Sequence, residues 1–159
     1  MKNKNNIPYI KLFWTVIVIL ISFLFIQVVI LISVVRAEDI NNVKVVDVYD
    51  GDTIYVDLEC KYDVLCKRIP IRLSHIDTPE MKTKNECEHI KAKIAKELVK
   101  HSIKYASVID LKDVSRDKYF RIDADVYFDN VNLNNLLIRK HLAYSYEGKK
   151  KQKIDWCNF

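Results

Sequence analysis

The chain has 159 residues, of which 26 are lysine or arginine and 21 are aspartate or glutamate, for a formal net charge of +5. This charge does not indicate a polyanionic partner, because residues 1–37 hold four of the basic residues and none of the acidic ones, which leaves 22 basic against 21 acidic residues beyond. Attraction of a polyanion would have to come from a local segment such as residues 149–153, and basic runs of this kind are usually solvated surface.

The N-terminal segment, residues 1–37, has the composition of an export leader. Three lysines precede a run of 24 uncharged, mainly apolar residues, 12–35. As a helix this run would reach roughly 36 Å, enough to cross a hydrocarbon core of about 30 Å. The charge asymmetry predicts that the N-terminus is cytoplasmic and the remainder is outside. The length favours a retained transmembrane signal-anchor, whereas the small residues around Ala37 suit a signal peptide cleaved before Glu38, and both alternatives stay open.

The remaining 122 residues, 38–159, suit one domain with one core. They hold all four cysteines, which an oxidising compartment would allow to pair. Cys60 and Cys66 flank a short polar segment and are one candidate disulfide. Cys87 and Cys157 are the other, which would tie a helix to the C-terminal tail. For Cys87 a buried free thiol is an equally good interpretation, because it shares a predicted helical face with apolar residues.

Hydrophobic periodicity predicts five strands and two helices. The first two strands are joined at Asp50–Gly51, a dipeptide that readily takes the positive φ angles of a tight hairpin. In the longer helix, Ile90, Ile94 and Leu98 repeat at helical intervals and predict an inward apolar face. The predicted strands are residues 43–48, 54–58, 68–75, 105–111 and 120–128, and the predicted helices are residues 84–103 and 133–140.

Carboxylates suited to a hard cation lie at two predicted strand ends. Asp52 has the strand parity of the apolar residues that follow it, and an ionised carboxylate turned inward must be paired or bound to a metal. Asp77, Thr78 and Glu80 follow the third strand. Each segment alone has an ordinary structural explanation, because aspartates in turns hydrogen-bond nearby amides and Asp or Thr residues cap helices.

Two arginines, Arg72 and Arg121, lie opposite the apolar faces of separate predicted strands. A guanidinium can hold a phosphate through two parallel hydrogen bonds. A single strand arginine is usually only solvated, and what is informative here is the convergence of both arginines with the three carboxylates. Together they predict a site for a metal ion and a phosphate.

Three segments resemble the staphylococcal (micrococcal) nuclease family, or thermonucleases, in wording, order and spacing. They are Asp-Gly-Asp-Thr at 50–53, Arg-Leu-x-x-Ile-Asp-Thr-Pro-Glu at 72–80 and Asp-Lys-Tyr-x-Arg at 117–121. The resemblance extends over residues 43–156, and the Trp156-Cys157 ending is similar to that of a small exported subgroup. It implies an α+β fold, a five-stranded OB-type β-barrel with packed helices, here preceded by an N-terminal hydrophobic helix. The pattern alone would predict only an α+β meander.

The resemblance implies a calcium-dependent phosphodiesterase. Asp52 and Asp77 would bind Ca²⁺ through their carboxylates and Thr78 through its backbone carbonyl. Glu80 would be the general base that activates the attacking water. The reaction would be endonucleolytic hydrolysis of DNA, RNA or both, with 3′-phosphorylated products.

Roles toward the substrate are implied in the same way. Arg72 and Arg121 would be catalytic, binding the phosphodiester and stabilising the charge that grows on it. Lys118 and Tyr119 would contact the terminal phosphate of a bound nucleotide. Either Tyr144 or Tyr146 would stack on the base.

The main alternative is a catalytically silent OB-type module that binds nucleic acid at the cell envelope. The presence of every motif carboxylate and arginine favours the enzyme. A calcium-stabilised envelope protein without a nucleic-acid substrate has only the near-neutral domain charge in its favour. We expect a monomer with no protein partner, which is membrane-anchored through residues 12–35 or, if cleaved after Ala37, secreted or periplasmic.

Overall fold

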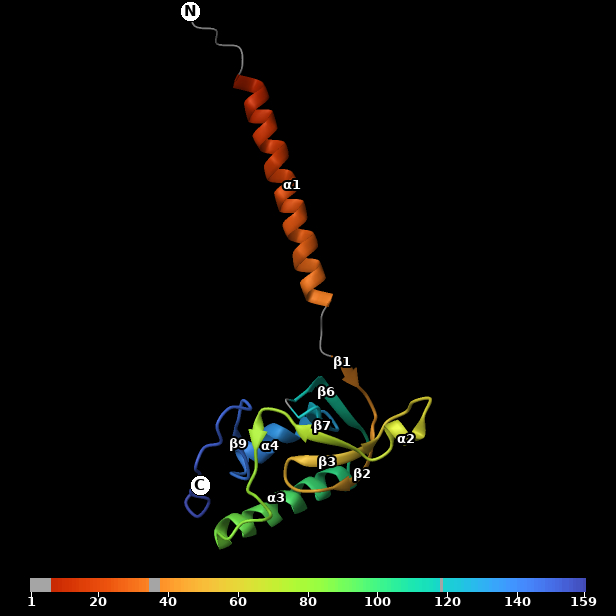
Figure 1. Cartoon of the computed structure of the whole chain (residues 1–159), viewed down its shortest axis with the longest axis vertical. Coiled ribbons are helices and arrows are strands. Elements are labelled where there is room, and N and C mark those ends of the chain that lie inside the picture. The colour runs from red at the N-terminus through yellow and green to blue at the C-terminus, as the bar shows by residue number, and fades with distance from the viewer. Residues whose placement is uncertain (1–6, 35–37, 118) are drawn as a thin grey trace, which may run out of the picture. The chain divides into compact units, whose positions relative to one another are not determined.

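The computed structural model describes residues 7–34, 38–117 and 119–159, which form two compact units (Figure 1). The N-terminal unit is the helix α1, Ile7–Val34. Among the described residues α1 is the one helix long and apolar enough to cross a membrane, through Leu12–Val29, and a signal sequence near the N-terminus would meet the same criterion. The predicted cleavage context, residues 35–37, lies outside the described residues.

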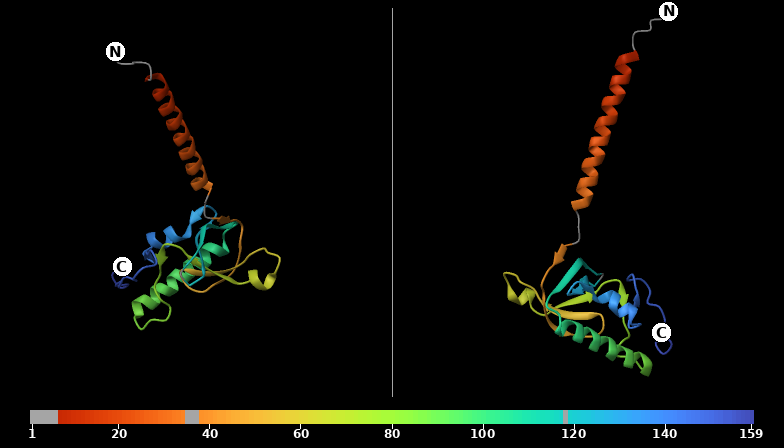
Figure 2. Two further views of the ribbon diagram at one scale, coloured as in Figure 1. Left: turned by 45° about the horizontal axis from the view of Figure 1, so that its top comes forward. Right: turned by 180° about the vertical axis from the view of Figure 1, so that it is seen from behind.

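The second unit is built on a strongly curled sheet with strand order β1-β6-β7-β4-β3-β2, in which β8 adds to β7 (Figures 1 and 2). Neighbouring strands are antiparallel except β4 and β7, which are parallel. The five predicted strands correspond to β2, β3, β4, β6 and β7. The bounds are β1 Glu38–Ile40, β2 Lys44–Val48, β3 Thr53–Asp57, β4 Ile69–Leu73, β6 Ile109–Arg116, β7 Ile122–Phe128 and β8 Val131–Asn132.

The chain itself joins the two edges of the curled sheet. β1 lies at one edge, paired with β6, and β2 lies at the other, paired with β3. Between them, Val43 N donates to Ile109 O at 2.8 Å and Asn42 N donates to the Asp110 carboxylate at 2.9 Å. The edges therefore meet at the start of β6, and the predicted α+β, OB-type arrangement is confirmed.

Apolar residues from the inner faces of the strands fill the curl. Ile54, Val56, Ile71 and Val126 are fully buried, because alternate residues of each strand point to the same side. The short helix α4, Leu133–Arg139, covers part of this core with Leu133 and Leu137, as its predicted range 133–140 required.

The helix predicted at 84–103 is present as α3, Glu86–Lys104, but its predicted inward face is only partly right: Leu98 packs against the core, and two of the isoleucines do not. Ile90 and Ile94 are 50% and 51% exposed, whereas Ala92, Ala95 and Val99 are buried against the sheet. The small inward residues allow α3 to lie close to β2 and to the loop that follows it. The helix thus turns inward the stripe with the smaller side chains, because that stripe lets the helix pack closely, and leaves the larger isoleucines outside.

The predicted tight turn at Asp50–Gly51 is also wrong. Neither residue has a positive φ, and Val48 still pairs with Ile54, so residues 49–53 form a wider loop closed by Tyr49 N donating to Thr53 O at 2.9 Å. Gly51 is required for space: a Cβ there would lie 2.9 Å from Ala95 Cβ and 3.0 Å from Thr78 Oγ1.

The last predicted strand begins later than expected. β7 starts at Ile122, and Phe120, predicted to share its inward face, is 80% exposed with a φ of 62°. The cause is a loop closed by Asp117, whose Oδ1 accepts hydrogen bonds from the backbone amides of Tyr119 and Arg121 at 2.8 and 2.9 Å. The fourth predicted strand is likewise displaced, since β6 covers Ile109–Arg116.

The tail after α4 is attached at both ends. Strand β9, Tyr144–Ser145, pairs with β5, Ile76–Asp77, and Trp156 is buried near the end of the chain. The structure pairs Cys87 of α3 with Cys157, so Cys87 is not a free thiol here. It also pairs Cys60 with Cys66 around the short helix α2, Asp63–Cys66.

Candidate active site

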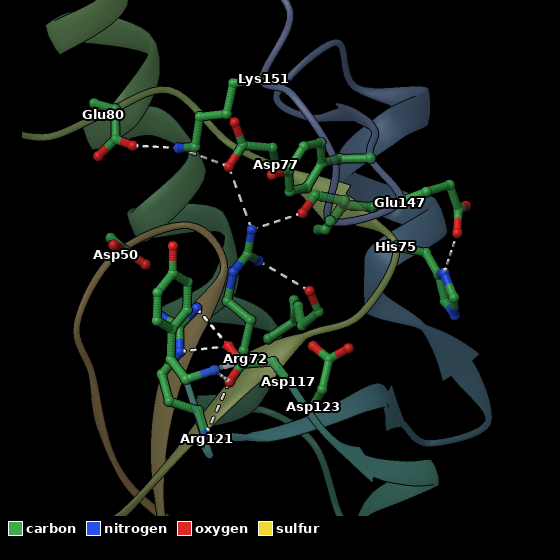
Figure 3. A pocket seen from close by; sticks show the side chains of 15 residues that line it. Asp50, Arg72, His75, Asp77, Glu80, Asp117, Arg121, Asp123, Glu147 and Lys151 are labelled. Carbon is green, nitrogen blue, oxygen red and sulfur yellow. Dashed lines mark hydrogen bonds and ion pairs between the residues drawn. The ribbon is translucent and has the colours of Figure 1, made fainter.

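A cavity of about 450 Å³ lies between the curled sheet and the C-terminal tail (Figure 3). Its lining comes from the loop after β2, from β4, from β5 and Glu80 beyond it, from the residues just before β7, from the start of β7 and from the tail. The predicted site residues that line it are Arg72, Asp77, Glu80, Tyr119, Arg121 and Tyr146. The structure therefore brings together residues that are far apart in the sequence. Asp52, Thr78 and Tyr144 are buried behind this lining, in contact with it.

Asp52 is a buried carboxylate fixed by the segment that follows β5. Its Oδ2 accepts hydrogen bonds from Thr78 N at 3.1 Å and Thr78 Oγ1 at 2.9 Å, and it lies 3.1 Å from Arg72 Nη1. Burial raises the pKa of Asp52 to about 6, although the Arg72 guanidinium opposes the shift. The inward carboxylate is thus paired, as its strand parity required.

Arg72 spans the two buried aspartates. Its side chain, only 11% exposed, alternates on β4 with the buried Ile71 and Leu73. Besides its contact with Asp52, Nη2 lies 3.3 Å from Asp77 Oδ1, and the terminal nitrogens donate to the carbonyls of Leu73 at 2.9 Å and Ile76 at 2.7 Å. These bonds hold the guanidinium rigidly at the cavity surface.

Asp77, at the end of β5, connects the cavity to the tail. Its Oδ2 accepts a hydrogen bond from the Tyr144 hydroxyl at 2.8 Å, and its Oδ1 faces Arg72 and Lys151. Burial, and to a smaller extent the hydrogen bond to Asp77, raises the pKa of Tyr144 to about 12. Because β9 pairs Tyr144 with Asp77 across the backbone, the tail and the carboxylate are positioned together.

Glu80 is exposed and shares a lysine with Asp77. Lys151 Nζ lies 2.6 Å from Glu80 Oε1 and 3.0 Å from Asp77 Oδ1, so one ammonium bridges the two carboxylates (Figure 3). Burial alone would lower the pKa of Lys151, but the hydrogen bonds to Glu80 and Asp77 hold that pKa above its ordinary value.

Arg121 lies across the cavity, just before β7. Its Nε and Nη2 both contact Asp117 Oδ2, at 2.8 and 2.7 Å, while 40% of its side chain remains exposed. Burial raises the pKa of Asp117, but hydrogen bonds from the Arg121 backbone and side chain outweigh it and hold that pKa below its usual range. The guanidinium is therefore oriented by one carboxylate and accessible to a ligand.

The two tyrosines proposed to stack on a base differ in accessibility. Tyr144 is buried, with its hydroxyl on Asp77, whereas Tyr146 lines the cavity and its hydroxyl donates to the Lys149 carbonyl at 2.7 Å. Tyr119 also lines the cavity, with its ring centre 5.6 Å from the Arg121 guanidinium carbon. Lys118 lies outside the described residues.

Several residues that line the cavity were not predicted from the sequence. Lys151 stands in a run of similar lysines, and the sequence contains no signal that distinguishes it from its neighbours. Asp117 belongs to a recognised motif, so its contact with Arg121 four residues later could have been inferred. The other lining residues with ionisable side chains that were not predicted are Asp50, His75, Asp123 and Glu147.

The donors fit a calcium ion in kind. Two buried carboxylates, with the half-buried carboxylate of Asp50 and the exposed one of Glu80 also lining the cavity, offer the oxygen ligands that calcium prefers. Within the described part of the chain no group of three or more His, Cys, Asp or Glu side chains is gathered closely enough to hold a metal. Backbone carbonyls and water would have to complete the coordination, and cationic side chains at present pair with both aspartates.

The second unit is thus a small α+β domain of the OB type, with two buried carboxylates and two arginines at or beside one cavity. A family model for staphylococcal nuclease homologues matches residues 70–156, more than half of the chain. The chain therefore belongs to the staphylococcal nuclease family. The matched range includes Arg72, Asp77, Glu80 and Arg121, while Asp52 precedes it. No curated protein matches the chain.

Proposed function

We propose that the chain is a calcium-dependent phosphodiesterase that cleaves DNA, RNA or both and leaves 3′-phosphorylated ends. One observation carries the proposal: Arg72 spans the buried carboxylates of Asp52 and Asp77 at the surface of a cavity that Glu80 and Arg121 also line. Family membership supports a nuclease-like hydrolase with a nucleic-acid substrate, and such enzymes typically depend on calcium.

The side chains that line the cavity would have different roles in the reaction. Arg72 and Arg121 would bind the non-bridging oxygens of the phosphodiester from different sides, and their preorganised positions favour the charge that develops in the transition state. Glu80, exposed and therefore able to contact solvent, would accept a proton from the attacking water. Tyr146 and Tyr119 would contact the nucleotide on either side of the reacting group.

Asp52 and Asp77, together with the Thr78 carbonyl, would hold the cation. A bound calcium ion would supply a positive charge beside the phosphate and polarise it. The carboxylates are positioned without it, Asp52 by Thr78 and Asp77 by Tyr144. The protein would therefore need little rearrangement of backbone to accept the ion.

We further propose that residues 38–159 act outside the cytoplasm, tethered by α1. An apolar N-terminal helix is typical of a signal or anchor, and two disulfides indicate an oxidising compartment. Substrate would then be nucleic acid present outside the cytoplasm.

The full chain, purified in detergent with its disulfides intact, provides the test. Single-stranded DNA should be cut when calcium is added and remain intact when it is chelated, and end-group analysis should find 3′-phosphates. Glu80→Gln, which removes the proton acceptor and keeps the side-chain shape, should cut far more slowly while still binding DNA. Calcium-independent binding without cleavage by the wild-type protein would instead support a silent binding module.

A further inference from the structure

We propose that Lys151 competes with the calcium ion for Asp77, so that the C-terminal tail sets the cation affinity of the site. The inference rests on the proposed calcium site and concerns a residue to which no role has been given. Lys151 Nζ lies 3.0 Å from Asp77 Oδ1 and 2.6 Å from Glu80 Oε1 (Figure 3). An ammonium thus already neutralises one proposed cation ligand and the proposed base.

A cation and Lys151 cannot both keep these contacts. Both Asp77 oxygens already have partners, because Oδ2 accepts a hydrogen bond from the Tyr144 hydroxyl and Oδ1 faces Lys151 and Arg72, so an ion bound by this carboxylate would lie close to the ammonium. A divalent cation placed there would repel the Lys151 ammonium, which lies 3.0 Å from Asp77 Oδ1, because like charges close together repel strongly near a protein surface. Binding of the ion therefore requires Lys151 to leave.

The lysine is free to leave, whereas Arg72 is not. The Lys151 side chain is 53% exposed and its bonds are made only at Nζ. Arg72 is 11% exposed and tied to two backbone carbonyls as well as to both aspartates. Displacement of the tail lysine is thus the less costly of the two adjustments.

Although its side chain can move, the backbone around Lys151 is anchored on both sides. Before it, Gly148, with a φ of +71°, permits the turn that the Tyr146 hydroxyl closes on the Lys149 carbonyl. After it, Trp156 is buried against Tyr144 at a ring-centre distance of 6.1 Å, and Cys157 is bonded to α3. The contact is therefore built into the fold and does not depend on a loose lysine-rich end.

Calorimetric titration of calcium into the full chain in detergent tests the competition directly. Lys151→Met should bind calcium about tenfold more tightly than the wild type, because the ion no longer has to break two ion pairs. The matched control is Lys150→Met, which removes the same charge from the neighbouring exposed lysine; it should bind within about twofold of the wild type, since an exposed charge is screened. In an Asp77→Asn background, Lys151→Met should no longer change the calcium affinity.

Equal or weaker calcium binding by Lys151→Met would overturn the inference, and so would the absence of calcium binding in every variant. Should Lys151→Met unfold, as judged by its thermal transition, Lys151→Gln serves in its place with the same expectation. Cleavage is measured separately on the same samples. Tighter calcium binding by Lys151→Met without cleavage by any variant would reject the nuclease proposal and leave the competition standing.

Discussion

At the scale of single residues, Arg72 and Arg121 occupy different surroundings although both point into one cavity. Arg72 is buried between two carboxylates, so its removal leaves two charges without their partner. Arg121 contacts one carboxylate and is 40% exposed. Replacement by alanine should therefore affect both stability and catalysis at Arg72, and mainly catalysis at Arg121.

Arg121→Ala should lower the cleavage rate by about 10²–10³-fold, the scale for loss of one preorganised charge donor, and leave the thermal transition nearly unchanged. Arg72→Ala should lose activity and also about 3–5 kcal/mol of stability. Initial rates on single-stranded DNA and urea denaturation of the same preparations measure both effects. An Arg121→Ala protein that cuts as fast as the wild type would refute the role of Arg121.

We expect Asp123 to make the stability of the fold depend on pH. Burial raises its pKa above the ordinary value, although Arg72 opposes the shift. A carboxyl with a raised pKa in the folded state stabilises the protein below its unfolded pKa, and this contribution is lost as pH rises through the folded pKa. Asp123→Asn should therefore raise the melting temperature at pH 7 and have little effect at about pH 3. A gain of the same size at both values would show that the carboxyl's ionisation is not the cause.

Much of the candidate site could be predicted from the sequence, whereas the role of Lys151 could not. Asp52 could be singled out because an inward carboxylate requires a partner, and Asp77 because its motif converges with the arginines and resembles a known family; the structure shows partners for both. Lys151 could not be, because five positions, 149–153, hold four lysines and only the path of the tail decides which reaches a carboxylate.

At the scale of elements, α3 and the loop after β2 determine how closely the site is assembled. Ala95 of α3 and Thr78 both approach the place where a Gly51 side chain would begin. The existence and length of α3 were predictable from its periodicity. Its inward face was not, because Ile90 and Ile94 formed the stronger apolar stripe and the need for small residues at the contact arises only in three dimensions.

Gly51→Ala should destabilise the protein by about 1–3 kcal/mol, the usual cost of overpacking. The new methyl would lie 2.9 Å from Ala95 Cβ and would displace Thr78 from Asp52. Urea denaturation measures the loss. In the double variant with Ala95→Gly, the two costs should be less than additive, because the second substitution removes the nearest clash. Strict additivity would place the strain elsewhere.

At the scale of the whole molecule, α1 bears on where the proposed enzyme would act. Its apolar run is long enough for a membrane span, and a signal sequence would meet the same criterion, so the fate of the leader is a matter for experiment. When the full chain is expressed with export, we expect it in the membrane fraction, resistant to carbonate washing and released by detergent. A soluble mature protein whose first residue is Glu38 would show that the leader is removed.

The disulfide between Cys87 and Cys157 has a consequence for survival among secreted proteases. Enzymes that cleave after lysine would find their targets at Lys149, Lys150, Lys151 and Lys153, all exposed. A cut there would open the backbone without releasing the C-terminal peptide, because Cys157 stays bonded to α3. The two fragments of the nicked protein would stay covalently linked until the disulfide is reduced. Trp156 would remain next to the disulfide-bonded Cys157, while the cut lysine segment would be attached at only one end.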